Sequence, residues 1–328
     1  MASLTERLIN ASFDKNAVST LDESSSVDRD LIDTGIPILN VAYSGSINGG
    51  FGSGLTTIAG PSRHFKSLLG LIFVSAYLRK YPDGICVFYD SEFGSSREYF
   101  ESIGIDTSRV LHIPIKNIEE LKFDAIKKLE EISKDDHVIF FVDSVGNLAS
   151  KKEIEDAIDE KSVADMTRAK QMKSFGRMVT PYLSINDIPM IVIAHTYKEM
   201  GMFPKDVVAG GTGIMYSSQT VFIMGRQQEK DGKEVVGYNF ILNIDKSRFV
   251  REKSKLTLTV TYEGGINKFS GLLDLAMEVG FVEKTGPGFY TRKTVENDKK
   301  WRAKQTNCEE FWEPILSNPE FNDAVVAR

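Results

Sequence analysis

An eight-residue stretch, GPSRHFKS at 60–67, constrains the fold of this chain more than any other feature. A short apolar run, Leu55–Ala59, precedes it, and a longer apolar segment follows it. This order predicts a strand, a loop and a helix that begins at Lys66. The arrangement is typical of a phosphate-binding P-loop, although Phe65 stands where the motif G-x-x-x-x-G-K-[ST] has its second glycine. The stretch therefore predicts a nucleoside triphosphate site with one unusual position.

The residues of this loop would bind the nucleotide together. Successive backbone N–H groups of a P-loop point into one concavity and bind phosphate oxygens. Lys66 would reach the β- and γ-phosphates, and the Ser67 hydroxyl would hold Mg²⁺. The candidate nucleotide-binding residues are Gly60, Pro61, Ser62, Arg63, His64, Phe65, Lys66, Ser67 and Leu68.

Three other apolar runs end in polar residues that suit the same site. Asp143 follows one run directly, as an acid that binds the water shell of Mg²⁺ does. Glu92 follows a second run, where a carboxylate could act as general base towards water. His195 follows a third, where a side chain can sense the γ-phosphate. Each acid alone also fits a cap or a turn, and His195 alone also fits a structural histidine. However, ligands bind beyond the carboxyl ends of parallel strands. The three residues together therefore predict one site.

Short apolar runs alternate with helical stretches between about Leu31 and Ile266, which predicts an α/β fold with a mainly parallel sheet and helices on both faces. The expected strands are Leu55–Ala59, Gly84–Tyr89, Arg109–Ile113, Val138–Val142 and Met190–Ala194. The expected helices are Lys66–Lys80, Arg97–Ser102, Ile118–Ser133 and Val163–Tyr182. Three later runs have no helices between them and predict antiparallel strands at one edge: Gln219–Met224, Tyr238–Ile244 and Lys255–Tyr262.

The chain divides into three expected segments. Residues 1–30 comprise an amphipathic helix and a linker, and a helix this short is expected to dock on another surface, such as a neighbouring copy; a frayed terminus is the alternative. Residues 31–269 form the nucleotide-binding core. Residues 270–328 form a small mixed domain with a helix at Gly271–Val279, a hairpin near Gly286–Gly288 and a helix at Glu309–Leu316.

Composition limits the class of protein. The net charge of −6 argues against a uniformly basic nucleic-acid coat but leaves local basic patches open. Cys86 and Cys308 are the only cysteines, so no disulfide framework is predicted and a reducing compartment is expected. Neither a membrane-spanning run nor a signal peptide is apparent. The chain is therefore expected to be cytoplasmic, in the host if a phage encodes it.

Five more strings accompany GPSRHFKS along nearly the whole chain, namely FYDSEFG, FFVDSVGNLASKKE, IVIAHTY, AGGTGIMYSS and NIDKSR. With them the chain resembles the RecA family of strand-exchange ATPases, and its tailed-phage branch more than its bacterial members. That branch also carries an aromatic residue at the position of Phe65. The resemblance implies a RecA-like P-loop ATPase core that uses ATP and Mg²⁺. It also implies a helical filament on single-stranded DNA that catalyses homologous pairing and strand exchange in recombination, repair and replication.

The resemblance also implies roles at single positions. The family's catalytic carboxylate falls on Glu92 and its Mg²⁺-associated acid on Asp143. His195 takes the nucleotide-sensing position, which is glutamine in bacterial members. Tyr99 takes the position of the aromatic residue that stacks on adenine. An acidic residue near the base in bacterial members is matched by Ser96, which leaves that contact open.

Two segments are implied to bind single-stranded DNA, near Ala149–Val163 and near Thr196–Gly213. Their candidate contacts are Lys151, Lys152, Lys161, Lys198, Phe203 and Lys205. The helix that follows carries a further basic set, for which an ordinary solvated face is an equal alternative: Arg168, Lys170, Lys173 and Arg177. The final domain is locally basic as well, which would suit capture of duplex DNA, through Arg292, Lys293, Lys299, Lys300, Arg302 and Lys304.

Lys246 and Arg248 form a separate basic pair. They stand two apart on an extended run, so they are expected to share one face and to continue the parity of Phe240, Leu242 and Ile244. In the family, paired basic residues here reach across the subunit interface to the ATP of the neighbour, as arginine fingers do. This role requires an oligomer, and a charged strand end is the alternative.

Three functions fit these features. The leading one is a recombinase that acts with single-stranded DNA, duplex DNA, further copies of itself, and single-strand-binding and mediator proteins. The others are a hexameric RecA-fold DNA helicase and a binding module that uses ATP only as a switch. At the unusual position of the loop, Phe65 is expected to keep a negative φ at the first turn of the helix, since a positive φ would store strain.

Overall fold

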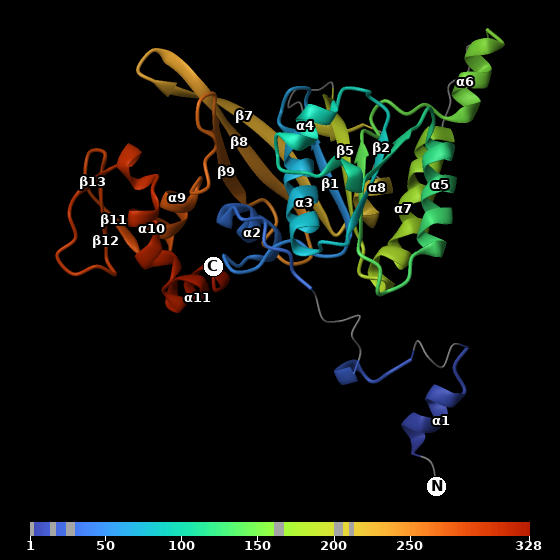
Figure 1. Ribbon diagram of the computed structural model, residues 1–328, viewed down its shortest axis with the longest axis horizontal. Coiled ribbons are helices and arrows are strands. Elements are labelled where there is room, and N and C mark those ends of the chain that lie inside the picture. The colour runs from blue at the N-terminus through green and yellow to red at the C-terminus, as the bar shows by residue number, and fades with distance from the viewer. Residues whose placement is uncertain (1–2, 14–17, 24–29, 161–166, 200–205, 210–212) are drawn as a thin grey trace.

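The computed structural model describes residues 3–13, 18–23, 30–160, 167–199, 206–209 and 213–328, and Figure 1 shows a twisted sheet with helices on both sides. The helices are α1 Leu4–Asn10, α2 Pro37–Ser44, α3 Lys66–Lys80, α4 Arg97–Glu101, α5 Ile118–Glu131, α6 Lys151–Ile158, α7 Thr167–Ile185, α8 Gly213–Ser217, α9 Leu272–Glu278, α10 Glu309–Leu316 and α11 Pro319–Val326. The strands are β1 Gly54–Gly60, β2 Ile85–Asp90, β3 Val110–Pro114, β4 Val138–Asp143, β5 Pro189–Lys198, β6 Asp206–Val208, β7 Thr220–Asp231, β8 Glu234–Ser247, β9 Lys255–Thr261, β10 Gly265–Ile266, β11 Val282–Gly286, β12 Phe289–Arg292 and β13 Trp301–Arg302.

The large sheet has the order β10-β9-β8-β7-β1-β5-β4-β2-β3, with β6 paired to β5. The pairs from β7 through β1, β5, β4 and β2 to β3 are parallel. The pairs from β7 to β10 are antiparallel. The predicted fold class and the antiparallel extension at one edge are therefore confirmed, and the P-loop strand β1 lies near the middle of the sheet.

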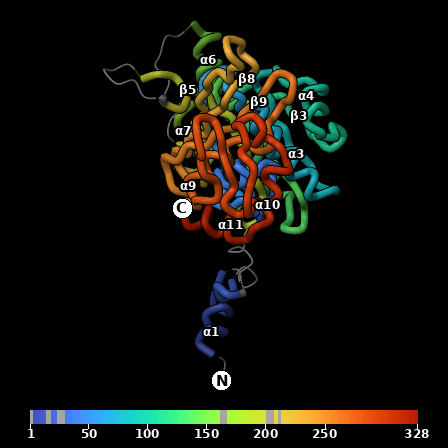
Figure 2. The backbone as a smooth tube through the Cα atoms, turned by 90° about the vertical axis from the view of Figure 1, so that its left-hand side faces the viewer, coloured from blue at the N-terminus to red at the C-terminus, as the bar shows by residue number. Residues whose placement is uncertain are grey.

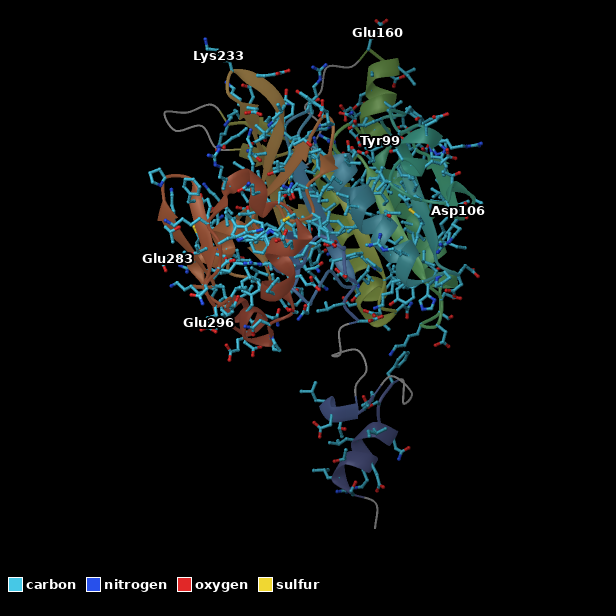
Figure 3. The ribbon with its side chains drawn as sticks, turned by 60° about the vertical axis from the view of Figure 1, so that its left-hand side comes forward. Tyr99, Asp106, Glu160, Lys233, Glu283 and Glu296 are labelled. Carbon is cyan, nitrogen blue, oxygen red and sulfur yellow. The ribbon has the colours of Figure 1, made fainter. Side chains whose placement is uncertain are left out.

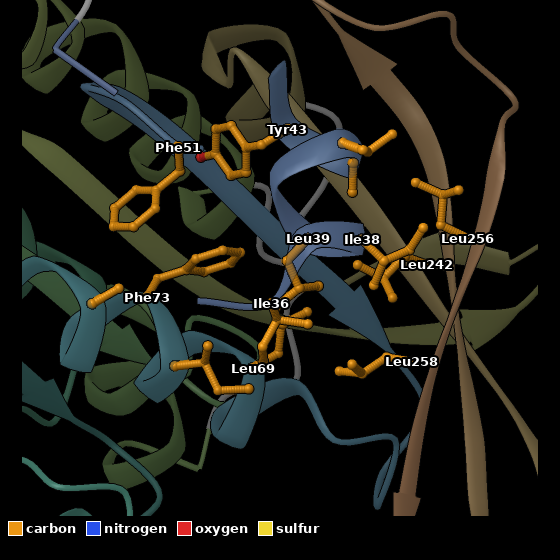
Figure 4. Close-up of a cluster of buried hydrophobic side chains, with 14 of the residues drawn as sticks. Ile36, Ile38, Leu39, Tyr43, Phe51, Leu69, Phe73, Leu242, Leu256 and Leu258 are labelled. Carbon is orange, nitrogen blue, oxygen red and sulfur yellow. The ribbon is translucent and has the colours of Figure 1, made fainter. Parts of the chain in front are cut away.

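Each face of the sheet has its own hydrophobic cluster. On one face, α5 and α7 contribute side chains such as Leu121 and Phe175. On the other face, α2 packs against β8 and β9, and α3 packs against β1, β2, β4 and β5. Figure 4 shows Leu39, Phe73 and Leu258 among the side chains of this cluster. All residues of β1 are buried, as expected for a strand whose two faces are both covered by helices.

Several expected boundaries differ in the structure, and β5, β7 and β8 extend furthest beyond the expected runs. Strand β3 begins at Val110, because Arg109 ends a short 3₁₀ turn and its Nε donates to the Gly84 carbonyl at 2.9 Å. Helix α7 ends at Ile185 rather than at Tyr182. The expected start of that helix, at position 163, lies outside the described residues.

Residues after 270 form α9, the three-stranded sheet β11–β12–β13, α10 and α11, so the predicted helices and hairpin are confirmed. Figure 2 shows these helices together on one side of the molecule. The tail shares the α2–α3 cluster through residues such as Leu275 and Trp312. The Asn322 side-chain oxygen also accepts hydrogen bonds from Ser46 Oγ at 2.8 Å and from the Ile47 N–H at 2.9 Å. The tail is thus packed firmly on the core.

The expected basic surface of the tail is partly wrong. Arg292 is buried, its Nη2 lies 2.6 Å from the Asp298 carboxylate, and its guanidinium lies over the Trp301 ring. It therefore belongs to the interior of the tail, where burial of its charge is offset by the paired carboxylate. Other tail lysines form exposed ion pairs: Lys293 with Glu283, Lys299 with Glu310, and Lys304 with Asp231.

Helix α1 buries none of its residues and lies apart from the sheet in both views. Leu4 and Leu8 expose 62% and 61% of their surfaces, so the apolar side of this helix is uncovered here. In the described part of the chain, every helix is too short or too polar to cross a membrane.

Candidate functional site

Lys66 is the lysine of the predicted P-loop motif. It begins α3 directly after the loop, is only 6% exposed, and its Nζ donates to the Pro61 carbonyl at 2.8 Å. Burial lowers the pKa of Lys66, while the charges of Glu92 and Asp143 oppose that shift. The loop therefore presents a buried ammonium group beside two carboxylates.

The expectation of a negative φ at Phe65 is wrong. Phe65 has φ 64° and ψ 13°, and Arg63 has φ 60°. A left-handed conformation costs an L-residue about 1–2 kcal/mol. The ring of Phe65 stacks on Phe240 of β8, and Arg226 of β7 donates to the Arg63 carbonyl at 3.0 Å. These contacts fasten the loop to the antiparallel strands and offset the strain that a glycine would have avoided.

Asp143 ends β4 and is 4% exposed. Burial raises the pKa of Asp143 to about 6, although a hydrogen bond from Ser67 opposes the rise. Among the described residues, Asp143 Oδ1 is one of few buried side-chain atoms without a hydrogen-bond partner. An unsatisfied carboxylate oxygen beside a hydroxyl group is the kind of donor set that Mg²⁺ or its water ligands bind. Ser67 and Asp143 thus fit the metal role expected for them.

Glu92 lies at the centre of a hydrogen-bond cluster. Its Oε1 is 2.7 Å from His195 Nε2, 2.5 Å from Ser144 Oγ and 3.3 Å from Asn147 Nδ2. The hydrogen bond from His195 lowers the pKa of Glu92 to about 2, against the opposing effect of burial. The carboxylate is therefore ionised at neutral pH, and His195 Nε2 must be the donor because an ionised carboxylate only accepts.

Neighbouring groups hold this cluster in place, and the sequence patterns did not single them out. Asp90 Oδ1 accepts the backbone N–H groups of Glu92 at 3.1 Å and of Phe93 at 2.7 Å. Gly146 leaves room for His195, since a Cβ there would lie 2.5 Å from His195 Cδ2. The only sequence signal for these residues was their place inside the strings FYDSEFG and FFVDSVGNLASKKE.

A family model described as the RecA N-terminal domain matches residues 2–267. The chain belongs to the RecA family. A second model, the C-terminal domain of the bacteriophage T4 recombination and repair protein, matches residues 269–325. The chain is 49% identical to the recombination and repair protein of Enterobacteria phage T4, across 99% of this chain and 85% of that protein. It is 26% identical to Protein RecA of Chloroherpeton thalassium, across 93% and 82%. The predicted family and the likeness to its phage members are confirmed.

Tyr99, which was expected to stack on adenine, lies on α4 and is labelled in Figure 3. It is half-buried, and burial and the charge of Asp143 raise the pKa of Tyr99 to about 12. The ring packs against the cluster formed by α2 and α3. Ser96 caps this helix, since its Oγ accepts the Tyr99 N–H at 3.3 Å.

Only some of the residues expected to bind DNA lie in the described part of the chain. Lys151 and Lys152 begin α6, Lys198 ends β5, and all three are exposed. Lys152 Nζ also lies 2.5 Å from Asp156. The other candidates, Lys161, Phe203 and Lys205, lie outside the described residues. Figure 1 shows α6 projecting beyond the end of the sheet.

Helix α7 has one buried apolar side and one exposed basic side. Met172, Phe175 and Val179 are buried against the sheet, whereas Ala169 is exposed. Lys170, Lys173 and Arg177 are exposed on the other side. Arg168 departs from that basic face, because its guanidinium donates to backbone carbonyls near the Glu92 cluster.

The expected parity of Lys246 is wrong. Phe222 of β7 pairs with Ile244, but Val221 pairs with Lys246, so Asp245 is an extra residue that forms a β-bulge. A bulge reverses which face the following residues occupy. Lys246 Nζ accordingly donates to the carbonyls of the α8 end, at 3.0 Å, 2.8 Å and 2.6 Å, namely Met215, Tyr216 and Ser218. Arg248 lies just beyond the strand and is exposed.

Proposed function

We propose that this chain is a DNA-dependent ATPase that forms a helical filament on single-stranded DNA and exchanges that strand into duplex DNA. Membership of the RecA family and the likeness to a phage recombination and repair protein support the proposal. The observation that carries it is the position of Glu92, an ionised carboxylate held by three donors beside a P-loop lysine. A switch that only bound ATP would not need such a group.

In the proposed reaction, Lys66 and the loop N–H groups bind the phosphates, and Ser67 and Asp143 hold Mg²⁺. The metal would neutralise charge on the phosphate oxygens. Water attacks the γ-phosphorus, the bond to the bridging oxygen of ADP breaks, and the proton of the water passes to Glu92. Because Oε1 receives all three hydrogen bonds, Oε2 is the oxygen available to accept that proton.

His195 would link hydrolysis to the nucleotide. Its hydrogen bond keeps Glu92 a weak base. The pKa of a good general base lies near the pH at which the enzyme works, whereas the pKa of Glu92 is about 2. A γ-phosphate that attracted His195 Nε2 would remove this bond and raise the basicity of Glu92. The base would then be active only when a triphosphate is bound.

The proposed DNA surface consists of α6 and the β5–β6 hairpin, which both continue from strands that end at the ATP site. Lys151, Lys152 and Lys198 would contact phosphates there. Tyr197 is 56% exposed at the same end of β5 and offers a ring on which a base could stack. Contacts of this kind bind the backbone with little sequence preference and weaken with salt.

Oligomer formation completes the proposed site. Lys246 and Arg248 would reach the ATP of a neighbouring copy, which requires Lys246 to leave the carbonyls of α8. Segment 1–30 would supply a contact between copies through the uncovered apolar side of α1, segment 31–269 the ATPase core, and segment 270–328 a surface for duplex DNA. In Lys246→Ala or Arg248→Ala, ATP should still bind while DNA-stimulated hydrolysis is lost; stimulated turnover in both variants would remove the pair from this role.

The direct test measures ATP hydrolysis with and without single-stranded DNA and images the protein–DNA product. Stimulated hydrolysis, extended helical filaments and joint molecules are expected. Rings that unwind forked duplex would indicate the hexameric helicase instead. An absence of turnover under all conditions would indicate a binding module.

A further inference from the structure

Arg168 lies in the first described turn of α7 and points towards the segment after β4. Its Nε donates to the Leu148 carbonyl at 2.7 Å, and its Nη2 donates to Gly146 at 2.6 Å and to Val145 at 3.2 Å. A guanidinium fork can satisfy several carbonyls at once, which a lysine ammonium, as a single point of charge, does less well. Arg168 therefore clamps one short stretch of backbone.

The clamped stretch holds the candidate general base. Within 144–148, the side chains of Ser144 and Asn147 both donate to Glu92 Oε1. Gly146 lies against His195, the third donor to the same oxygen. Moving this stretch by an ångström would disturb all three side-chain hydrogen bonds to Glu92 Oε1.

The same stretch leads directly into the proposed DNA-binding helix. Ala149 and Ser150 separate it from α6, and the Ala149 carbonyl accepts the Ile118 N–H of α5 at 3.0 Å. A force on Lys151 would therefore reach 144–148 within a few residues. Arg168 holds that stretch from the opposite side, from the helix that carries the exposed basic residues Lys170 and Lys173.

We propose that Arg168 is a positioning residue for Glu92, which couples nucleic-acid contact at α6 and α7 to the geometry of the general base. The coupling rests on the proposed DNA-dependent hydrolysis, whereas the clamp itself does not. Arg168 touches neither ATP nor DNA in this role. Its influence passes through the backbone of 145–148.

The first test needs no ATPase activity. Hydrogen–deuterium exchange of the DNA-free protein should show faster exchange in peptides covering 144–149 in Arg168→Lys than in the native chain, with exchange in β4 and α5 unchanged. Unchanged exchange in 144–149 would overturn the clamp. Faster exchange everywhere would show that Arg168 serves general stability, which overturns the positioning role.

The second test separates positioning from DNA contact. In Arg168→Lys, kcat at saturating single-stranded DNA should fall about tenfold or more, as expected for a misplaced base, while ATP KM and DNA affinity stay within about twofold. The matched control is Lys170→Gln, which removes an exposed cation two residues away. It should lower DNA affinity and its salt dependence and leave kcat at saturating DNA unchanged. Equal losses of DNA affinity in both variants would make Arg168 a DNA contact.

A double-mutant cycle with Asn147→Ala tests the route. Asn147 is exposed, so the alanine variant should fold. If Arg168 acts through this stretch, the two substitutions are not additive, and the pair should lower kcat by no more than about twofold beyond the larger single effect. Fully multiplied effects would reject the route. If DNA does not change the rate of ATP hydrolysis by the native protein, the proposed function is wrong. The exchange experiment and the basal kcat would still test whether Arg168 clamps 145–148.

Discussion

Phe65 and Phe240 stack with ring centroids 4.5 Å apart and planes inclined by 23°. The pair explains how a P-loop can carry an aromatic residue in place of glycine. Strain at the backbone of Phe65 is held in place by contact with a strand that lies 175 positions further along the chain. The loop is thereby attached to β8, the strand that also carries Lys246.

Phe65→Gly should destabilise the protein by about 1–2 kcal/mol. Glycine relieves about 1 kcal/mol of left-handed strain, but the lost ring burial and stacking outweigh that gain. Urea unfolding measures the free energy, and titration with a fluorescent ATP analogue should show weaker binding. Phe240→Leu is the control, because it removes the stack and keeps the strain. A more stable Phe65→Gly protein would contradict this account.

Glu92→Gln should bind ATP and hydrolyse it at least about 10²-fold more slowly, because an amide cannot accept the proton of the attacking water. Single-turnover hydrolysis and nucleotide titration measure the two properties separately. Lys66→Ala serves as the comparison and should lose ATP affinity as well. Native turnover in Glu92→Gln would assign the base to another group.

The same residue predicts a pH dependence of stability. A carboxylate whose pKa is lowered in the folded state stabilises the protein above its unfolded pKa of about 4.5, and this contribution is lost as pH falls towards about 2. Because Glu92 is partly exposed, we expect only about 1 kcal/mol. Glu92→Gln should therefore unfold more easily at pH 7 and show a flatter stability curve between these values. Glu101→Gln, on an exposed site, is the control and should follow the native curve.

Gly146→Ala should displace His195 from Glu92. The added Cβ would lie 2.5 Å from His195 Cδ2, so the imidazole ring must move. Because loss of the His195 hydrogen bond raises the basicity of Glu92, we expect DNA-independent turnover to rise about tenfold. ATP affinity should be kept, since the loop and Lys66 are untouched. Gly94→Ala is the matched control, because a Cβ there meets nothing within 4 Å. Native kinetics in Gly146→Ala would show that the His195 contact has no part in hydrolysis.

Mg²⁺ binding should weaken in mild acid. Burial raises the pKa of Asp143 to about 6, so a proton competes with the metal below that value. The apparent Mg²⁺ affinity of the ATP complex should fall about tenfold per pH unit below pH 6. The raised pKa also means that ionised Asp143 is unfavourable in the folded protein. Its contribution therefore lowers the free energy of unfolding as pH rises from about 4 to 6. Asp143→Asn should bind Mg²⁺ weakly at every pH. If Mg²⁺ affinity in this variant still falls below pH 6 as in the native protein, another group is responsible for the pH dependence.

Local patterns predicted which strand ends the structure brings together at one edge of the sheet. An apolar run followed by Asp143 or His195 can be recognised from adjacent residues, and parallel strands necessarily bring their carboxyl ends to one edge of a sheet. The partners of Glu92 were harder to predict. Ser144 and Asn147 resemble ordinary loop residues until β2 and β4 are placed side by side, with Asp90 paired to Asp143.

The sequence by itself determined the βαβ order, the P-loop, the two-faced burial of the sheet and the family, because each depends on residues near one another in the chain or on whole strings. The tertiary structure alone decided three features. These are the positive φ of Phe65, the hydrogen bonds of Arg168 to the backbone of 145–148, and the face of the sheet on which Lys246 lies. Each of these depends on a partner far away in the sequence. One extra residue at Asp245 reverses the face of everything beyond it, and alternation along a single strand cannot show where its neighbour makes it bulge.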